Sequence, residues 1–600
     1  YTRWALPLSF ALPLLGLLIA SLVRFRHRGH VLALMVVGLL IGVGAHPYDA
    51  PSPLGRLFRE LTLTDAGLAL RSTPRVLPLT VLGTAVLLGA GVEAVARWRP
   101  RLEAPVVLVA CALVVANLSP MWRGEMLGEL VQRPEDVPDY WHETAAHLDT
   151  RPQNTRVLEI PGTDFATHRW GNSGDPLLPG LMDRSHASRE LIPLGTEASA
   201  ALMVAFDTEI QEGRFDSDGL APLARLLGAG DVVFRADLQY ERFRTPRPPD
   251  LWADLQAASG FGEAVGFGES VPNLAGPERP LLDEHTLARP AGTPDPFQAV
   301  VLPVLDPVGI LRVADPDRAI ILAGDAEGLV AAAGEGLIQA GRPVLFSATL
   351  AGQPEVLRDL AGPGARIVIT DTNRKAGQRW GTIRETSGYT ERAEEQPMRN
   401  DLSDHRLAVP GGQTDHQTVA LQSGLRVSAS AYGNPVTFTA GDRPFHAVDG
   451  SLATAWTVGA FNHVVGERLV LELSEPVPVP SLTVLQAALE GQNRWITDLR
   501  IHLDGAQVDV VLDDTSRSVP GQVIQLSNGV IGRIVLEIRG TDVGTLDYYA
   551  GVTGVGFTEV TVAGVTPDET LRMPVDLAAA RGPDRGAELV ILATRLRSDP

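Results

Sequence analysis

Three consecutive residues, His168, Arg169 and Trp170, bring together side chains suited to binding phosphate and sugar. A guanidinium can hold a phosphate through paired, charge-assisted hydrogen bonds, and an indole offers a flat apolar face with one N–H donor. The imidazole adds a group that titrates near neutral pH. We therefore predict that this triplet contacts a phosphate or a sugar. The alternative is a surface ion pair of Arg169 beside a tryptophan that only packs.

The segments that precede this triplet are dominated by four uncharged apolar stretches, at residues 4–23, 31–45, 76–92 and 104–122. At a rise of ~1.5 Å per residue, about 20 such residues cross a hydrocarbon core roughly 30 Å thick. We predict four transmembrane helices within residues 1–122. The stretch at 31–45 is short for a span, and buried helices of a soluble core are the alternative for the whole group.

Arginine clusters beside these stretches predict their orientation. Residues 24–28 hold three arginines in one short connection, and residues 97–101 hold three more, two spans later. Short connections rich in Lys and Arg remain on the cytoplasmic side of the plasma membrane, so everything after Trp122 should face the outside of the cell. Between the clusters, residues 54–61 carry leucines at helical spacing and predict a short amphipathic helix on the outer membrane surface.

The charge balance argues against nucleic acid as a partner. The formal net charge is −20, and the acidic excess lies after the apolar region, in the part predicted to be outside. The only cysteine, Cys111, falls inside the fourth apolar stretch. The outer domains therefore have no disulfide framework and must fold by burying apolar surface alone.

Residues 139–400 alternate strand-like and helix-like segments and predict an α/β domain. Strands are expected at 154–160, 231–235, 318–322, 343–348 and 366–370, and helices at 197–212, 220–227, 326–339 and 354–360. Strands separated by helices of this length predict parallel βαβ units with a helix-covered sheet. Neither GxGxxG nor GxxxxGK[ST] is present, so Asp325 is expected to cap a helix and not to mark a phosphate loop. Residues 245–296, rich in Pro and Gly, predict a long loop or a domain seam.

Residues 403–562 change to short alternating strands separated by turn residues. The expected strands are 425–429, 436–439, 469–473, 481–485, 497–503, 507–512, 522–526, 533–539 and 556–562. This spacing predicts an antiparallel β-sandwich. Residues 563–600 are expected to begin a further, truncated β-rich segment. The whole chain is thus predicted to be a multi-domain membrane protein and an internal part of something longer.

Residues 447–456, Ala-Val-Asp-Gly-Ser-Leu-Ala-Thr-Ala-Trp, with the strands at 469–473 and 556–560, resemble the signature of the discoidin-like jelly roll. That fold often serves as a carbohydrate-binding module. In the family, the Asp-Gly turn and a carboxylate near the last strand commonly hold a structural Ca²⁺, an ion that accepts oxygen ligands in irregular geometry. The resemblance implies Asp449, Thr454 and Glu559 as ligands. The alternative is a tight turn in which Asp449 bonds its own backbone.

Sugar binding by such a module needs exposed aromatic rings, on which the C–H edges of a sugar ring can stack. Tyr548 and Tyr549, in a Gly-rich loop, are the preferred candidates. The family pattern implies instead that Trp456 is buried in the sandwich.

The passages at 156–165, 167–171 and 180–185, placed between a multi-span segment and a discoidin-like module, resemble the arabinofuranosyltransferase D family. These are large polytopic glycosyltransferases of the GT-C class that build cell-envelope arabinan. The resemblance implies decaprenyl-phosphate arabinose as the lipid-linked donor, a growing arabinan as the polysaccharide acceptor, and transfer on the outer face of the plasma membrane. It also implies a catalytic carboxylate in an outer loop before residue 1, so we assign no catalytic base.

Two other classes of function stay open at this stage. One is a non-catalytic, membrane-anchored protein that binds envelope polysaccharide with both outer domains. The other is a scaffold of envelope assembly. Residues 1–600 do not separate the transferase from the binding protein decisively, because the discriminating carboxylate would lie upstream.

Overall fold

The computed structural model of the 600-residue chain divides into two compact units, Tyr1–Gln132 and Arg133–Pro600. The structure describes residues 5–44, 46, 51–62, 73–122, 136–163, 165–190, 196–211, 213–243, 245–274, 295–372, 375–377, 387–395, 414–433, 439–526, 529–544, 550–581 and 586–594. The first unit is helical, and the second contains all the β-sheets that these residues form.

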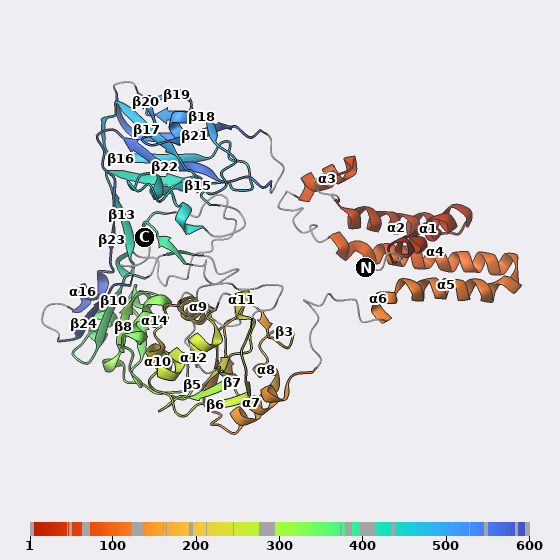
Figure 1. The fold of residues 1–600 in the computed structure, drawn as a ribbon, viewed down its shortest axis with the longest axis horizontal. Helices are drawn as coiled ribbons and strands as arrows, with labels where there is room; N and C mark the ends of the chain where they lie inside the picture. Colours follow the sequence, from red (N-terminus) through yellow and green to blue (C-terminus); the bar gives the residue numbers. More distant parts are fainter. Residues whose placement is uncertain are drawn as a thin grey trace. The chain divides into compact units, whose positions relative to one another are not determined.

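The first unit has helices at all four predicted apolar stretches (Figure 1). The α-helices of this unit are α1 Ala5–Leu22, α2 Arg28–Val43, α3 Pro53–Thr62, α4 Leu77–Trp98, α5 Glu103–Asn117 and α6 Ser119–Trp122. Within the described part, two segments are long and apolar enough to cross a membrane, Leu77–Trp98 and Pro100–Asn117. The apolar helices Phe10–Ile19 and Arg28–Val43 are shorter. The short helix expected between the arginine clusters is present as α3.

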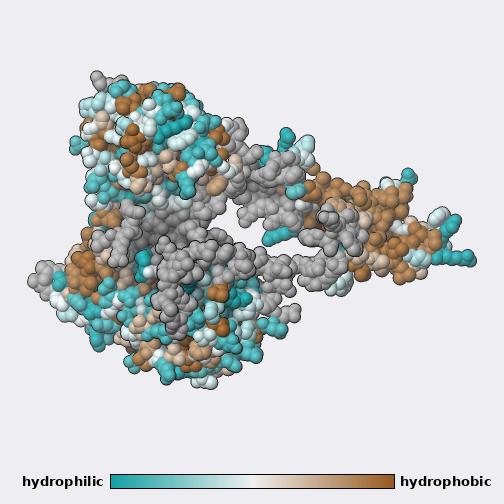
Figure 2. Space-filling model, in the orientation of Figure 1, coloured by the Kyte–Doolittle hydropathy of each residue, from teal (hydrophilic) through white to brown (hydrophobic). Residues whose placement is uncertain are grey.

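Small residues let α2 and α4 approach closely. A Cβ added at Gly83 of α4 would stand 2.7 Å from Met35 Cβ, and one added at Gly38 of α2 would stand 2.6 Å from Thr80 Oγ1. Close backbone approach at glycines is typical of helices that pack in lipid. The outward faces of the helices are apolar (Figure 2); exposed side chains include Val81, Leu82, Leu108 and Val109.

The first sheet of the second unit has the strand order β4-β1-β5-β7-β6. Its strands are β1 Arg156–Ile160, β4 His186–Ala187, β5 Ala229–Arg235, β6 Val265–Ser270 and β7 Phe297–Pro303. β1 pairs in parallel with β4 and β5, whereas β7 runs antiparallel to β5 and β6. The sheet is therefore mixed: β4, β1 and β5 are parallel, as predicted for the α/β domain, whereas β7 and β6 form an antiparallel edge that was not predicted. Its helices include α7 Asp139–Asp149, α9 Glu197–Gln211, α10 Leu220–Leu226 and α12 Pro248–Ala257.

The prediction of a long loop at residues 245–296 is wrong for two segments, α12 and β6. Pro248 and Pro249 open α12 at its first turn, where a missing backbone N–H costs little. Leu251 and Leu255 lie one turn apart and are buried. The abundance of proline favours a loop in the sequence, but Pro248 and Pro249 begin a helix in the structure.

The second sheet has the order β24-β10-β8-β9, and all its pairs are parallel. Its strands are β8 Ile320–Ala323, β9 Val344–Phe346, β10 Arg366–Thr370 and β24 Glu588–Leu592, with helices α14 Ala326–Gly334 and α15 Pro354–Leu360 between the first three. This confirms the predicted βαβ unit. Asp325 caps α14 as expected, because its Oδ1 accepts the N–H groups of Glu327 at 3.0 Å and Gly328 at 3.3 Å.

The chain returns to this sheet after it has formed the sandwich. β23 Asp568–Arg572 pairs antiparallel with β13 Val419–Ser423, α16 Asp576–Arg581 packs beside α15, and β24 pairs with β10. α16 and β24 thus complete the α/β part, which corrects the prediction of a further, truncated β-rich segment over residues 563–600. The pairing of β24 with β10 leaves no local signal in the sequence, because Arg366 and Glu588, which pair at one end of the two strands, lie 222 residues apart.

The β-sandwich consists of two antiparallel sheets, β14-β16-β21-β18-β19 and β15-β22-β17-β20. Its strands are β14 Leu425–Ala429, β15 Trp456–Val458, β16 Arg468–Pro478, β17 Ser481–Gln486, β18 Ile496–Leu503, β19 Ala506–Val511, β20 Gln522–Gln525, β21 Val530–Thr541 and β22 Val555–Val562. Every expected strand is found except that at 436–439, most of which lies outside the described residues. Trp456 is fully buried and stacks on Phe557, with ring centroids 6.0 Å apart.

The returning segment should be part of the α/β core. Leu577 is fully buried and packs in a cluster with Leu357 and Ile367. We expect Leu577→Ala to cost about 2–5 kcal/mol of stability, because a buried leucine leaves a cavity. Leu589→Ala, on the same segment but 38% exposed, should cost much less. Amide hydrogen exchange of β10 in the full-length protein would report both changes. Equal effects of the two variants would contradict the packing of α16 on this sheet.

Candidate functional site

The sequence-predicted triplet surrounds a buried carboxylate, Asp237, which follows β5 at the carboxyl end of that strand. Asp237 Oδ2 accepts hydrogen bonds from Tyr140 Oη at 2.8 Å, Trp141 Nε1 at 3.0 Å and Trp170 Nε1 at 2.9 Å. His168 Nδ1 lies 3.0 Å from Oδ1 of the same carboxylate. Side chains from α7, from the segment after β1 and from the end of β5 therefore meet at one anion.

The anion is stable despite its burial. Burial disfavours the charged form of Asp237, but the charge of His168 and the hydrogen bonds of His168, Tyr140 and Trp141 outweigh it and hold the pKa of Asp237 below its ordinary value. Burial, followed by the neighbouring Asp237, raises the pKa of Tyr140 well above its ordinary value. At neutral pH the carboxylate therefore accepts and the phenol donates.

The aromatic rings around Asp237 are fixed relative to one another. His168 packs edge-on against Trp141, with centroids 5.6 Å apart, and stacks on Trp170 at 5.0 Å. His168 is 1% exposed, so its role in the described structure is to position Trp170. The orientation of the Trp170 indole is set from both sides, by the stacked imidazole and by the hydrogen bond to Asp237.

Arg169 is held by an ion pair. Its Nη1 and Nη2 donate to the two carboxylate oxygens of Glu241, each at 2.6 Å, and its Nε donates to Asn273 Oδ1. The guanidinium also lies 5.3 Å from the ring centroid of Tyr240. The arginine side chain is 24% exposed and the glutamate 3% exposed. The sequence analysis gave an ion pair of Arg169 as the alternative to ligand binding. The structure contains that ion pair, but it is largely buried and does not lie on the surface.

Arg169 and Trp170 nevertheless line a pocket of about 360 Å³, which we call the Trp170 pocket. Its other walls include Tyr140, Asp237 and Asn273, with prolines on either side of residues 275–294. The volume lies in the range of small-ligand sites, roughly 300–1,000 Å³. The structure thus brings two members of the triplet to a pocket and buries the third, His168, behind them.

The turn after Ala447 brings together the three residues implied as calcium ligands. Asp449 Oδ1 accepts the N–H of Ser451 at 2.9 Å, and its Oδ2 accepts the hydroxyl of Thr454 at 2.7 Å. Glu559, on β22, accepts the N–H of Gly450 at 3.0 Å. Gly450 has a φ of +75°, which only glycine adopts without strain and which allows the tight turn.

The electrostatics of this turn fit a bound cation. Burial, together with the nearby charge of Asp449, raises the pKa of Glu559 to about 7, against the opposing effect of the Gly450 N–H. A carboxylate whose charged form is disfavoured by burial and by a neighbouring carboxylate is a natural place for a divalent ion. No group of three or more His, Cys, Asp or Glu side chains suited to a metal occurs among the described residues, so further ligands would have to come from the hydroxyl of Thr454 and from main-chain oxygens.

The preferred sugar-stacking residues, Tyr548 and Tyr549, lie outside the described residues, and their role stays a prediction. The loop that contains Thr553 and the loop at 459–462 are held by a residue that sequence reasoning missed. Arg494 is fully buried and donates to the carbonyl oxygens of Gly459, Asn462 and Thr553. An arginine that binds only loop carbonyls has no local sequence signal, because its partners come from two separate loops.

The pKa of Glu559 gives a test of the turn. Between about pH 4.5 and pH 7 the folded protein retains a proton that the unfolded chain releases, so this contribution to stability is present in acid and lost as the pH rises through 7. In chelator, Glu559→Gln should therefore raise the thermal midpoint relative to the wild type at pH 8 and have little effect at pH 4. Added Ca²⁺ at pH 8 should stabilise the wild type but not the variant. Parallel pH profiles for the two proteins would contradict this account.

Comparison with known proteins identifies relatives over nearly the whole chain. A family model described as "Alpha-(1->3)-arabinofuranosyltransferase, N-terminal GT-C domain" matches residues 3–405. The alpha-(1->3)-arabinofuranosyltransferase of Mycobacterium tuberculosis (strain ATCC 25618 / H37Rv) is 26% identical over 612 residues, which cover 94% of this chain and 41% of the relative. That of Mycolicibacterium smegmatis (strain ATCC 700084 / mc(2)155) is 25% identical, covering 93% and 40%.

The fold is also shared with solved structures. The cryo-EM structure of arabinofuranosyltransferase AftD from mycobacteria aligns with a TM-score of 0.60 at 21% sequence identity, over 96% of this chain and 41% of that one. Its R1389S variant, in one class, aligns with a TM-score of 0.58 at 22% identity, over 90% of this chain. The chain spans about 41% of the length of the curated relative from M. tuberculosis. Because the family model matches well over half of its residues, the chain belongs to the alpha-(1->3)-arabinofuranosyltransferase family with an N-terminal GT-C domain.

Proposed function

We propose that the chain is part of a membrane-bound arabinofuranosyltransferase. The enzyme transfers arabinose from decaprenyl-phosphate arabinose to cell-envelope arabinan on the outer face of the plasma membrane. The observation that carries this proposal is the family match over residues 3–405, which includes the helical unit and most of the α/β part together. The relatives that match are named alpha-(1->3)-arabinofuranosyltransferases.

The helical unit supports the membrane location. Its outward side chains are apolar (Figure 2), and the segments Leu77–Trp98 and Pro100–Asn117 have the length and composition of spans. The arginines at 24–28 lie between the bodies of α1 and α2, and those at 97–101 lie where α4 ends and α5 follows. We place both connections on the cytoplasmic side. On α3, Leu54, Leu57 and Leu61 are 51%, 68% and 45% exposed along one face. We place this helix in the outer interface, where that face enters the lipid.

The Trp170 pocket is the proposed contact with the sugar in the α/β part. The indole N–H is held by Asp237 and one ring face is covered by His168, so the indole is preorganised to offer its exposed surface to the apolar C–H edges of a pentose. Arg169 is neutralised by Glu241 and stiffens the wall. We therefore assign sugar contact to Trp170 and positioning roles to His168 and Arg169. No described residue is assigned as the catalytic base.

In the sandwich, we propose a structural Ca²⁺ held by Asp449 and Glu559, with Thr454 orienting the aspartate. When bound, the ion would neutralise two carboxylates and tie the turn to β22. The chain's own part is to keep the loop end of the sandwich fixed, since the Asp449 hydrogen bonds and the Arg494 bonds to the loop carbonyls both act there.

Transfer by the full-length protein tests the proposal. Membranes that contain it should convert decaprenyl-phosphate arabinose and an oligo-arabinan acceptor into a longer arabinan. No product with acceptors of any length would favour the non-catalytic polysaccharide-binding protein.

Substitution at Trp170 tests the proposed sugar contact. Trp170→Ala should lower kcat/KM about tenfold or more, because the stacking surface is lost. Trp170→Phe keeps an aromatic face and loses only the hydrogen bond to Asp237, which retains its other donors, so it should keep most of the activity. Equal losses in the two variants would assign Trp170 to packing and not to the sugar.

A further inference from the structure

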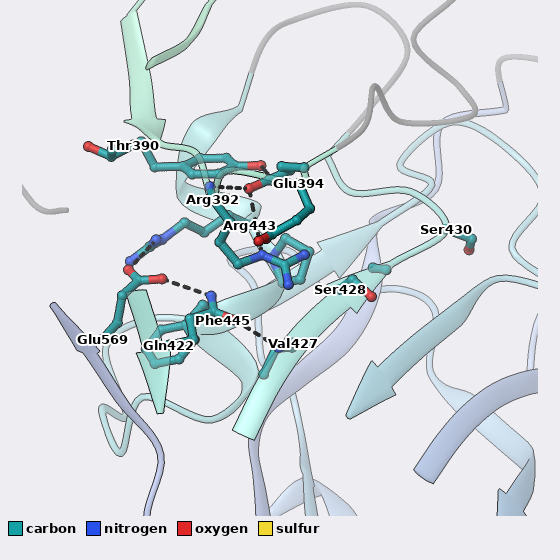
Figure 3. Close-up of a pocket in the computed structure, with 14 residues that line it drawn as sticks. Thr390, Arg392, Glu394, Gln422, Val427, Ser428, Ser430, Arg443, Phe445 and Glu569 are labelled. Carbon is teal, nitrogen blue, oxygen red and sulfur yellow. Dashed lines mark hydrogen bonds and ion pairs between the residues drawn. The ribbon is translucent and has the colours of Figure 1, made fainter. Parts of the chain in front are cut away.

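A second pocket, of about 420 Å³, lies where the segment around β12 (Ser387–Thr390) meets the edge of the β-sandwich (Figure 3). We call it the seam pocket. One wall carries Tyr389, Arg392 and Glu395, and another carries Ser428 and Ser430 at the end of β14. Its volume falls in the range of small-ligand sites, roughly 300–1,000 Å³.

The floor of the seam pocket is a chain of hydrogen bonds between three strands. Arg443 Nη1 donates to Glu569 Oε1 on β23 at 2.6 Å, and Gln422 Nε2 on β13 donates to Glu569 Oε2 at 2.8 Å. Gln422 Oε1 in turn accepts the N–H of Val427 on β14 at 2.8 Å. Figure 3 shows these groups facing one another. Both oxygens of the Glu569 carboxylate, and both the oxygen and the nitrogen of the Gln422 amide, form hydrogen bonds, so the floor is rigid.

The same arginine ties the Tyr389 wall to the floor. The Arg443 guanidinium lies 5.3 Å from the ring centroid of Tyr389 and 5.6 Å from that of Phe445, so it packs between these two rings while it binds Glu569. Tyr389 Oη donates to Glu395 Oε1 at 2.7 Å, and the main chain of Glu391 accepts the N–H of Ala420. The pocket is therefore a built cavity and not a gap between loosely joined segments.

The chemistry of the lining favours an uncharged ligand with many hydroxyls. The lining holds two guanidinium groups and three carboxylates, and Arg443 is paired with Glu569 and Arg392 with Glu395, so a phosphate would meet no uncompensated positive charge. Among the described residues, Ser428 Oγ and Arg443 Nη2 have no hydrogen-bond partner. A sugar hydroxyl, which both donates and accepts, can satisfy either of them.

We propose that the seam pocket binds a short, neutral segment of the arabinan acceptor, separately from the Trp170 pocket. This inference rests on the proposed transferase function for the identity of the glycan. The pocket retains the acceptor chain between the α/β part and the sandwich, so that a polymer remains attached between successive transfers. Binding of the acceptor in the seam pocket does not require the discoidin-type loops of the sandwich.

A fluorine probe can report binding at this place alone. Cys111 is the only cysteine of residues 1–600, so Cys111→Ser with Arg426→Cys, and with any cysteine of the remaining chain replaced by serine, gives one labelling site, exposed on β14 two residues from Ser428. A neutral arabinofuranose oligosaccharide should shift the ¹⁹F signal of the labelled full-length protein saturably, and inorganic phosphate should not. No shift with the oligosaccharide, or a shift with phosphate alone, would overturn the proposal.

Variants at Ser428 test the occupant directly, because its side chain makes no hydrogen bond to another described residue that the substitution would remove. In the labelled protein, Ser428→Trp fills the pocket and should raise the Kd at least tenfold, about 1.4 kcal/mol, whereas Ser428→Ala should raise it two- to threefold. Ser481→Trp, on β17 and away from the lining, is the matched control and should leave the Kd unchanged. An unchanged Kd in Ser428→Trp with an unaltered thermal midpoint would refute the site.

The two proposals can fail separately. If the wild-type protein transfers arabinose but the ¹⁹F signal does not respond, only the seam pocket is refuted. If the signal responds and no transfer occurs, the chain binds glycan without the proposed activity. Should Ser428→Trp not fold, the response of the labelled wild type and of Ser428→Ala still decides the question.

Discussion

The parallel pairing of β24 with β10 is the constraint on which the second unit of this protein depends. Five register pairs join the strands, and Arg366 Nε donates to Glu588 Oε2 at 2.7 Å at one end of the ladder. Because the chain between these strands forms the whole β-sandwich, closing the sheet also ties both ends of the sandwich to the α/β part. The β13–β23 pair is the short two-stranded connection that results.

This closure explains where polar groups from distant parts of the chain can meet. Glu569 on β23 reaches Arg443, 126 residues earlier, only because β23 is drawn back beside β13. The seam pocket is thus a consequence of topology. The Trp170 pocket has a different origin, since it forms at the carboxyl end of the parallel strands β1 and β5, where loops of an α/β sheet commonly bind ligands. In the Trp170 pocket, the buried Asp237 fixes the orientation of the Trp170 indole through a hydrogen bond.

The sequence was informative where the signal is local. Apolar length predicted the helices, period-two alternation predicted nearly every strand of the sandwich, and Asp325 was recognised as a cap from its place before a helix. The triplet at 168–170 was recognised from residue types, yet its partners were not. Asp237 could have been suspected, because it follows a fully buried strand, whereas Arg443 and Glu569 pair across a separation that no periodicity reveals. The same holds for β24, whose pattern was visible but whose partner was not.

The closure of the sheet by the returning strand is the central claim, and a disulfide tests it most directly. Arg366 and Glu588 are register partners at the accessible end of the ladder. In a background with Cys111→Ser and with any cysteine outside residues 1–600 replaced by serine, Arg366→Cys with Glu588→Cys should cross-link rapidly and almost completely under mild oxidation in the folded full-length protein. Glu355→Cys with Glu588→Cys should not. Failure of the 366–588 pair to cross-link in folded protein would contradict the closure of the sheet by β24.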